Sequence, residues 1–494
     1  MNLLPPAGRA VDAAAFALAA LAAAVAVGTL QHRSQQLTVP PAPPLAVDET
    51  AAAGRLAGAV RFRTVTSDPP SEASRADLLR LHAYLEQSFP RAHAALKREI
   101  VGGYSLLYTW PGRDLAAKPV LLMAHQDVVP VAPGTEDRWQ TAPFAGEIRD
   151  GFVWGRGTWD DKGNLMAILE AVELLAAQGF EPRRTIYLAF GHDEESGGEA
   201  GAKAIAALLA ARGVRLDFVT DEGLLITDGI LPGLSSPAAL IGVAEKGSVT
   251  LALTATEAPG HSSMPGPRSA IGALAAALAR LEQSPLPAAI RGVPKEMLET
   301  LAPEMSAAKR VLLSNLWLFG PLVQAGLERA PSTNAMLRTT TALTVVRAGN
   351  KENVLPGEAV ALVNFRLLPG DSIERVVGHA RRAIHDERIR IEVAPGATEA
   401  SAVASTDTAS YQLINRTVRT LFPGVLVAPG LMIGGTDSRH MAAIADNVYR
   451  FSPVRARSED LPRFHGTDER ISIENYAELI RYYHRLMSAA AGGA

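Results

Sequence analysis

Three apolar segments of the chain are each followed closely by residues that can bind a metal ion. They are VLLMA before His125 and Asp127, TIYLAF before Asp193, Glu194 and Glu195, and LDFVT before Asp221 and Glu222. The chain contains no cysteine, so a metal ion must be held by histidine nitrogen and carboxylate oxygen atoms. The residue types at these predicted strand ends therefore indicate metal-dependent chemistry.

The run Asp193, Glu194 and Glu195 is costly at the end of an apolar strand, because neighbouring carboxylates repel and raise each other's pKa. A divalent cation would offset that cost. With a cation present, one glutamate can coordinate it while the other takes a proton from metal-bound water and passes it to a leaving group. We therefore expect different roles for Glu194 and Glu195, and assign none to Asp193.

His125 and Asp127 lie two residues apart, so their side chains project the same way from an extended chain. This spacing lets His125 bind a metal ion while Asp127 orients the imidazole from behind. A histidine and an aspartate at this spacing also occur in ordinary surface turns, so the pair gains weight only from the other motifs.

Asp160 and Asp161 follow Gly155 and Gly157 just before a predicted helix. An aspartate at a helix start often caps free backbone N–H groups. Capping explains one aspartate more readily than a pair, so Asp160 is a candidate metal ligand.

Six motifs together resemble the co-catalytic di-zinc metallopeptidases that include aminoacylases. In chain order they are HQD, GRGTWDDKG, HDEESGG, DEG, PGHSSMPG and RFHGTDER, and the resemblance covers roughly residues 50 to 490. Within that family the chain looks most like the carboxypeptidase S branch and its secreted N-acyl-amino-acid hydrolase relatives. The N-terminal apolar segment, the HQDVVPV motif and the length of the inserted domain favour this branch.

The resemblance implies two zinc ions per chain, with cobalt or manganese as alternatives. The implied ligands are His125, Asp160, Glu195, His465 and one acid of the TDEG turn, either Asp221 or Glu222. Asp160 would bridge the ions, with Glu194 as general base and Asp127 as the residue that orients His125. The ligand atoms are all nitrogen and oxygen, as a chain without cysteine requires.

His261 lies in a Gly/Pro loop, where a histidine is more often an ordinary turn residue. The resemblance implies instead that it reaches a neighbouring subunit's site and stabilises the oxyanion of the tetrahedral intermediate. It therefore also implies a homodimer formed through the smaller domain. Our candidates for binding the substrate's carboxylate and acyl carbonyl are Asn334, Arg366, Gly435 and Arg439, since the planar fork of arginine suits a carboxylate.

The elements that must position these residues predict an α/β fold. Helical patterns at 164–177 and 200–211 separate the apolar segments, which indicates an α/β layered domain with ligands beyond the strand ends. From Gly247 the pattern becomes βαββαβ, typical of a ferredoxin-like domain, interrupted by a leucine-rich helical insertion at 285–335. The resemblance implies that the first is a three-layer zinc-peptidase-like catalytic domain and the second an inserted lid or dimerisation domain.

These patterns divide the chain into five predicted regions. They are a signal peptide or single membrane anchor at 1–30, a proline-rich linker at 31–50, the first segment of the catalytic domain at 51–246, the inserted lid at 247–397 and the second segment of the catalytic domain at 398–494.

The uncharged apolar run from Ala13 to Leu30 is at the border between a signal-peptide core and a minimal membrane span. We favour a retained anchor, with the linker as an extended spacer and the protein either membrane-anchored or periplasmic or secreted. A net charge of -3 without a basic run argues against a nucleic-acid partner, so membrane contact is expected only through the N-terminal segment.

The leading hypothesis is a zinc-dependent hydrolase that cleaves the amide bond to a C-terminal amino acid in short peptides or N-acyl amino acids. The attacking group would be a metal-bridging water, with Glu194 moving the proton. The alternative is a non-catalytic amino-acid or peptide binding protein on the same fold. We expect His82, His379 and His484 on the surface, and His192 is at most an outer group of the site.

Overall fold

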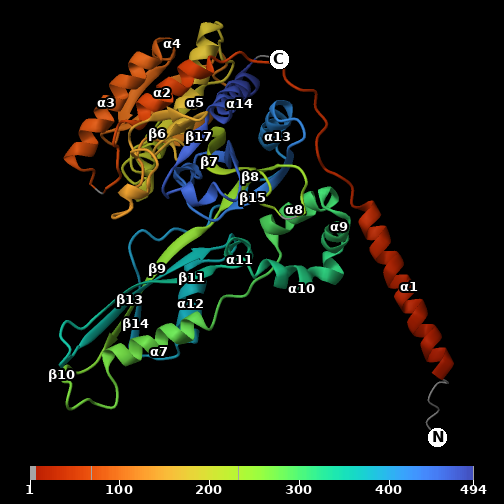
Figure 1. The fold of residues 1–494 in the computed structure, drawn as a ribbon, viewed down its shortest axis with the longest axis vertical. Coiled ribbons are helices and arrows are strands. Elements are labelled where there is room, and N and C mark those ends of the chain that lie inside the picture. The colour runs from red at the N-terminus through yellow and green to blue at the C-terminus, as the bar shows by residue number, and fades with distance from the viewer. Residues whose placement is uncertain (1–6, 68, 232, 493–494) are drawn as a thin grey trace.

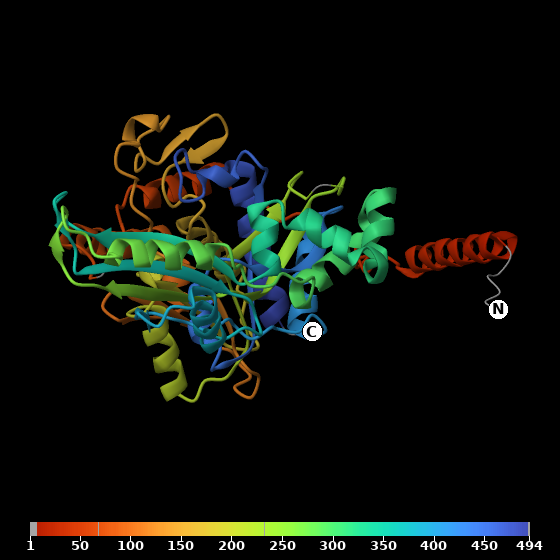
Figure 2. The same ribbon diagram turned by 90° about the horizontal axis from the view of Figure 1, so that it is seen from below.

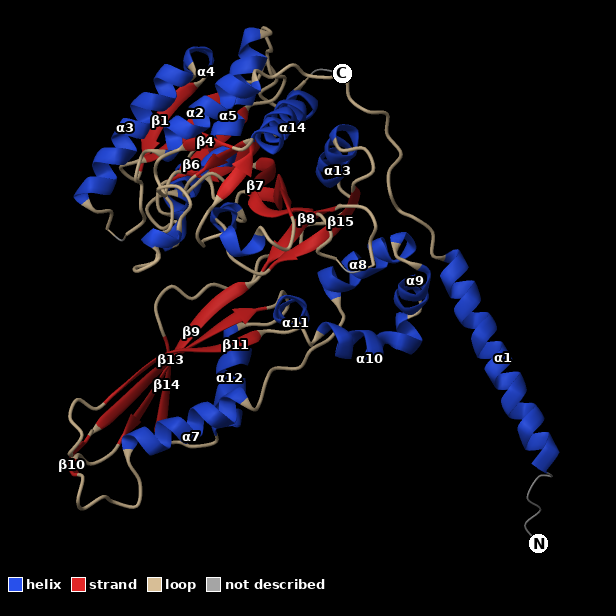
Figure 3. Ribbon diagram, in the orientation of Figure 1, coloured by secondary structure: helices blue, strands red, loops and turns tan. Residues whose placement is uncertain are grey.

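A layered α/β body carries a smaller projecting sheet, and a long N-terminal helix projects away from the body, with its C-terminal end bonded to the region of Ser314 and Asn315 (Figure 1). The computed structural model describes residues 7–67, 69–231 and 233–492. Figure 3 shows that strands form the centre of both units and that helices cover them.

The body is built on an eight-stranded sheet. In spatial order its strands are β1 (Lys97–Val101), β2 (Ser105–Trp110), β6 (Ile186–Gly191), β3 (Val120–His125), β7 (Leu216–Thr227), β16 (Ala445–Ala456), β8 (Ala238–Glu245) and β15 (Leu426–Met432). The central strands β6, β3, β7 and β16 run parallel, so their carboxyl ends meet at one edge. This edge is where a ligand site is expected in an α/β sheet.

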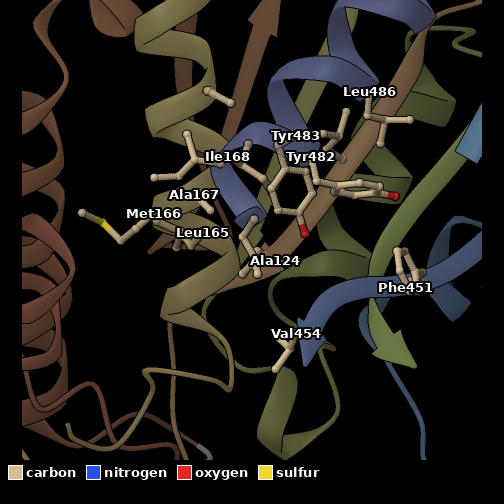
Figure 4. Close-up of a cluster of buried hydrophobic side chains, with 14 of the residues drawn as sticks. Ala124, Leu165, Met166, Ala167, Ile168, Phe451, Val454, Tyr482, Tyr483 and Leu486 are labelled. Carbon is tan, nitrogen blue, oxygen red and sulfur yellow. The ribbon is translucent and has the colours of Figure 1, made fainter. Parts of the chain in front are cut away.

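Helices cover both faces of this sheet. The helices of the body are α2 (Glu49–Val60), α3 (Glu72–Ser88), α4 (Pro90–Ala95), α5 (Lys162–Ala177), α6 (Ala202–Ala211), α13 (Ala409–Leu421) and α14 (Ile473–Ala491). Along β3, Leu122 and Ala124 join the core beneath α5 and α14, whereas Leu121 and Met123 join the core beneath α6. Figure 4 shows the first of these cores. Alternating strand side chains thus bury β3 on both sides.

The smaller unit confirms the predicted βαββαβ order. It comprises β9 (Gly247–Thr256), α7 (Ala270–Glu282), β11 (Thr340–Ala348), β13 (Glu358–Leu367), α12 (Ile373–Ile384) and β14 (Ile389–Val393). The strands form an antiparallel sheet in the order β11-β13-β9-β14, which leaves β11 at an edge. A separate apolar core packs its helices on its sheet. The fold class predicted from the sequence is therefore confirmed.

Short elements complete the two units. They are β4 (Glu147–Arg149), β5 (Phe152–Trp154) and β17 (Arg470–Ser472) in a three-stranded sheet, and β10 (Gly260–His261) paired with β12 (Val354–Leu355) at the tip of the lid. Short 3-10 turns also occur within the described ranges, at 136–138, 194–196, 302–304, 437–441 and 461–463.

The predicted insertion is helical, and it packs on the body rather than on the small sheet. Its helices are α8 (Gly292–Leu301), α9 (Ala307–Ser314), α10 (Leu316–Leu327) and α11 (Pro331–Leu337). Met297 and Leu301 of α8 share an apolar cluster with Leu426 and Ala428 of β15.

Strand β7 differs from the sequence expectation. The apolar pattern predicted a strand end near Thr220, but β7 continues through Asp221 and Glu222. Its pairing with β16 shifts register between Asp221 and Leu224, so the chain bulges at Glu222 and Gly223. Gly223 has φ +140, and a Cβ there would lie 2.8 Å from Arg450 Cβ. A glycine is required at this bulge because a side chain would meet the neighbouring strand.

The N-terminal helix α1 (Ala7–Gln31) leaves the body (Figure 1). Among the described residues, one helix is long and apolar enough to cross a membrane, at Val11–Gln31 with mean hydropathy 2.2. The linker after it is not a free spacer. Gln36 exchanges two hydrogen bonds with the backbone of Val427, and Ala42 N donates to Thr420 O at 2.9 Å. The linker is therefore fastened along the body.

Candidate metal centre

Five separate segments bring nitrogen and oxygen ligands together at the carboxyl edge of the large sheet. They are the end of β3, the loop before α5, the turn after β6, the bulge of β7 and the turn before β17. Two groups of three residues each bring one ligand atom per residue within 4.8 Å of the other two atoms of the group. The first group is His125, Glu194 and Glu222, and the second is His125, Asp160 and Glu195. Residues far apart in the sequence thus form one cluster, with His125 common to both groups.

Asp160 lies between the two histidines. Its Oδ1 is 2.9 Å from His125 Nε2, and its Oδ2 is 2.8 Å from His465 Nε2. Glu195 Oε2 lies 3.5 Å from His465 Nε2. One carboxylate facing two histidines is the arrangement expected of a ligand shared between two metal ions.

The orientation of His125 is set by its other ring nitrogen. Nδ1 lies 2.9 Å from the backbone carbonyl oxygen of Asp127 and 3.4 Å from Asp127 Oδ1. A carbonyl can only accept, so Nδ1 donates to it, and in the metal-free protein Nε2 donates to the carboxylate of Asp160. With a metal ion bound, Nε2 would be the nitrogen left free to coordinate it. The main-chain carbonyl of Asp127 is thus closer than the side chain that the sequence suggested.

The carboxylate of Asp127 has a second task that the sequence did not reveal. Its two oxygens accept hydrogen bonds from the backbone N–H groups of Glu194 and Glu195, at 3.2 and 3.1 Å. Asp127 therefore fixes the backbone of the acid run against the end of β3.

Asp221 and Glu222, which the sequence left as alternatives, have different surroundings. Both oxygens of Asp221 accept backbone hydrogen bonds, from Glu222 N at 3.0 Å and Ser438 N at 2.8 Å. Glu222 Oε1 points into the cluster, 3.8 Å from His125 Nε2. Glu222 is therefore the acid of this turn that faces His125, whereas Asp221 is held by backbone N–H groups.

Two buried charged residues join the loop that carries Asp160 to the turn that carries His465. Glu469 Oε1 accepts hydrogen bonds from the backbone N–H groups of residues 157, 159 and 160. Its Oε2 lies 2.7 Å from Arg156 Nη1, and Arg156 Nη2 donates to the carbonyl of His465 at 3.2 Å. Sequence reasoning missed this clamp, although Arg156 stands in the GRGTWDDKG motif and Glu469 in RFHGTDER.

The carboxylates of Asp161 and Asp193 accept hydrogen bonds from backbone N–H groups and do not point into the cluster. Asp161 Oδ2 accepts a hydrogen bond from His125 N at 3.1 Å. Asp193 Oδ2 accepts one from Ala200 N at 2.8 Å, which closes the glycine-rich turn after the acid run. Asp193, unassigned from the sequence, thus shapes this turn.

Asp437 is a further residue that sequence reasoning missed. It is buried behind the acid-run turn, and a Cβ at Gly198 would lie 1.9 Å from its Oδ1. Neither of its carboxylate oxygens has a hydrogen-bond partner within the described part of the chain, and burial raises its pKa well above the usual value.

His82 was wrongly expected on the surface. It is buried, and its Nε2 lies 2.8 Å from the side-chain oxygen of Gln126, the residue after His125. His192 stays outside the cluster, with Nδ1 at 2.6 Å from Ser105 Oγ. A helical position alone does not distinguish a surface histidine from a buried one.

The cluster holds more negative charge than its own histidines balance. Burial raises the pKa of Glu194 and of Glu222 well above the usual value and also raises that of Glu195. Hydrogen bonds with Asp160 and Glu195 raise the pKa of His465 to about 10. Glu195 Oε1 is buried and has no hydrogen-bond partner among the residues described. A bound cation would satisfy that oxygen and stabilise the ionised carboxylates, so the residues fit a metal site.

Basic side chains gather beside the cluster, between the body and the lid. Arg439 Nη2 donates to the carbonyl of Gly197 at 2.7 Å, two residues after Glu195. Burial and the nearby charge of Arg439 lower the pKa of Arg366, which lies on β13 of the lid. Burial, with the charge of Arg366, lowers the pKa of Lys246 to about 7. Lys246 is a member of this group that sequence reasoning did not select.

The remaining predicted substrate residues lie around this basic group. Gly435 leaves room for Arg439, because a Cβ there would lie 3.0 Å from its Nη1. Asn334 is on α11, next to Ala335, whose carbonyl accepts a hydrogen bond from Lys246 Nζ at 2.9 Å. Gly435 and Asn334 thus border the basic group.

His261 is not part of the cluster within a single chain. It is exposed at the tip of the lid, in β10, and its Nδ1 lies 2.8 Å from Ser263 Oγ (Figure 1).

Comparison with known proteins agrees with this geometry. Residues 121–489 match the model of peptidase family M20/M25/M40. The chain is 44% identical over 439 residues to the probable carboxypeptidase S-like 2 of Dictyostelium discoideum, covering 88% of this chain and 84% of that protein. It is 42% identical over 435 residues to the N-fatty-acyl-amino acid synthase/hydrolase of Xenopus tropicalis, covering 87% and 84% of the two chains.

Solved structures share the fold at low sequence identity. A metallo-carboxypeptidase of Sulfolobus solfataricus matches with a TM-score of 0.63 at 17% identity, covering 90% of this chain and 99% of that one. Human carnosine dipeptidase 1 matches with a TM-score of 0.62 at 17% identity and the same two coverages. The extent of the family match and the identity to curated relatives show that this chain belongs to peptidase family M20/M25/M40 and is an amide-hydrolysing metalloenzyme.

Proposed function

We propose that the protein hydrolyses the amide bond to a C-terminal amino acid, in N-acyl amino acids or short peptides, with two zinc ions bound. The observation that carries this proposal is Asp160, whose two oxygens each face a histidine within 2.9 Å, next to Glu195. Relatives named as a carboxypeptidase and as an N-fatty-acyl-amino acid synthase/hydrolase, at 44% and 42% identity, support this substrate class.

The residues that would hold the metal ions are those of the cluster: His125, Asp160, Glu195, Glu222 and His465. Their imidazole and carboxylate groups suit zinc, and cobalt or manganese would also accept them. Bound metal ions would acidify a water molecule and polarise the scissile carbonyl. Glu222 is chosen over Asp221 because its carboxylate faces His125, whereas the carboxylate of Asp221 faces the backbone of Ser438.

Glu194 is the proposed general base. Its backbone is fixed by Asp127, and its carboxylate lies in the cluster beside Glu222 without facing either Asp160 or His465 at hydrogen-bond distance. A carboxylate held there can accept a proton from the attacking water and deliver it to the leaving amine.

The free carboxylate of the substrate would bind Arg366 and Arg439. Lys246 would stand behind them, because its ammonium already donates to the carbonyls of Ala335 and Arg338. Arginine offers two parallel N–H donors to a carboxylate, which gives direction as well as charge. Asn334 and Gly435 are the proposed neighbours of the acyl carbonyl. The group is close to Glu195 through the contact of Arg439 with Gly197, so both ends of the amide can be reached together.

His261 would act in a homodimer, reaching the cluster of a second chain and stabilising the oxyanion. Its exposed place at the lid tip, outside the cluster of its own chain, supports a role in the cluster of a second chain. Strand β11 forms an exposed edge of the lid sheet, with Val346 61% exposed. An unpaired edge strand with apolar side chains supports pairing between two lids.

The N-terminal helix supports export, with retention as a single membrane anchor. Its 21-residue apolar stretch is 0% buried in the fold.

A panel of N-acyl amino acids and dipeptides, read by release of free amino acids, tests the proposal. The variant Glu194→Gln should lose about 10²- to 10⁴-fold in kcat while retaining its zinc, because only the proton carrier is removed. The matched control is Glu199→Gln, an exposed residue of the same loop with a side chain 67% exposed, which should keep full activity.

Two results would contradict the proposal in different ways. Unchanged turnover in Glu194→Gln would refute the assignment of the base. Zinc-loaded wild-type protein that binds the panel without releasing any amino acid would favour a non-catalytic binding protein instead.

A further inference from the structure

Helix α10 is apolar on every side, although it lies at the surface. Its sequence LWLFGPLVQAGL contains no charged residue, and none of its residues is buried. Leu316, Val323 and Leu327 pack toward the apolar cluster beneath α8 and β15. On the other side Trp317 is 64% exposed and Leu322 is 62% exposed. A helix that is apolar all round needs an apolar environment on both faces.

The junction between α9 and α10 is bonded directly to the C-terminal end of α1. The side-chain amide of Asn315 donates to Thr29 Oγ1 at 2.9 Å and to the carbonyl of Val25 at 3.2 Å. His32 Nδ1 lies 3.1 Å from Ser314 Oγ. The start of α10 is thus attached to the helix that is long enough to cross a membrane.

The orientation of α10 relative to α1 fits a membrane surface. Figure 1 shows α10 beside the upper part of α1 and running away from it across its direction, and Figure 2 shows the same neighbourhood from below. The 21 residues at Val11–Gln31 extend about 31 Å at 1.5 Å per residue, the thickness of a hydrocarbon core. If α1 crosses a bilayer, α10 lies along its surface.

The residues around α10 have the chemistry of an interfacial segment. Trp317 presents a large ring with a polar N–H, which suits the headgroup boundary. Arg329 is exposed directly after the helix and next to Glu328, where its guanidinium can attract an anionic lipid headgroup.

We propose that α10 is an interfacial membrane helix that inserts its outer face, including Trp317 and Leu322, into the bilayer crossed by α1. The linker is fastened to the body through Gln36 and Ala42, so the body cannot swing away from α1. The protein therefore sits directly on the membrane at two attachment points. The contact holds the body in one orientation, which a single anchor on a free spacer would not do.

The absence of cysteine gives a clean test with the full-length chain in vesicles of phosphatidylcholine and phosphatidylglycerol. Leu322→Cys carries a single spin label on the proposed face, and Leu79→Cys carries one on α3, where Leu79 is 52% exposed. We expect the label at 322 to show high collision with oxygen and low collision with a nickel complex. The label at 79 should show the opposite, because it faces water.

Tryptophan quenching gives an independent readout. Trp317 is exposed, whereas the other four tryptophans, at 110, 139, 154 and 159, are buried. Brominated lipid should quench part of the emission of the wild-type chain and almost none of that of Trp317→Phe.

Two outcomes would overturn the proposal. A water-accessible label at 322 in vesicles would show that α10 stays outside the bilayer. Efficient disulfide formation between two chains through Leu322→Cys, with no lipid quenching of Trp317, would show that a second copy of the chain covers this face.

Discussion

The buried pair of Glu469 and Arg156 provides a test of how the metal centre is assembled. The Glu469 side chain is 0% exposed and that of Arg156 is 2% exposed, with 2.7 Å between Oε2 and Nη1. Replacement of Glu469 by glutamine keeps the shape and leaves Oε1 able to accept the three backbone N–H groups of the Asp160 loop. It removes the charge and places an amide donor opposite the Arg156 guanidinium.

The magnitude follows from the loss of one partner of a buried ion pair. Such a loss costs about 3–5 kcal/mol, because the remaining charge stays buried without compensation. Weakening of the charge-assisted bonds to residues 157, 159 and 160 acts in the same direction. We therefore expect Glu469→Gln to lower the free energy of unfolding by about 3–5 kcal/mol and zinc affinity by about 10- to 100-fold, since the clamp positions metal ligands.

Denaturant unfolding and a competitive zinc titration measure the two effects. The matched control is Glu478→Gln, which breaks a more exposed pair with Arg455 at 2.7 Å and should cost at most about 1 kcal/mol. If Glu469→Gln unfolds at the same denaturant concentration as this control and binds zinc normally, the clamp does not hold the centre together.

Three further predictions concern charge, recognition and backbone. In metal-free protein the pKa of His465 is raised to about 10, so its stabilising contribution is complete below about pH 6.5 and is lost as pH rises toward 10; thermal unfolding should show this slope, and His465→Asn should abolish it. Arg366→Ala should raise KM for an N-acyl amino acid about 10- to 100-fold, because it removes a charged hydrogen bond to the substrate's carboxylate. The analogue with a carboxamide in place of that carboxylate should have a higher KM in the wild-type protein, and the variant should not change it. Gly198→Ala should impair zinc binding because its Cβ would lie 1.9 Å from Asp437 Oδ1. The control Gly134→Ala, at φ +77 in open space, should lower the free energy of unfolding by about 1 kcal/mol and leave zinc binding unchanged. Equal zinc affinity in the two variants would contradict this.

The layer structure could be predicted because burial leaves a direct mark on sequence. The runs VLLMA and TIYLAF are buried on both faces and became β3 and β6. The βαββαβ order of the lid could be followed from alternating strands and amphipathic helices. Strand β7 was harder, because Asp221 and Glu222 interrupt its apolar pattern while its pairing with β16 continues around the bulge.

The sequence by itself determined the ligand chemistry: a chain without cysteine that repeats His, Asp and Glu after apolar strands must use nitrogen and oxygen ligands. Tertiary structure alone decided which acids point inward. Asp221 turns to the backbone and Glu222 to the cluster because neighbouring side chains of a strand point to opposite sides, and the pairing of β7 with β16 sets which side faces the cluster. The clamp of Glu469 and the exposed face of α10 likewise depend on contacts between segments far apart in the chain, which composition and spacing do not record.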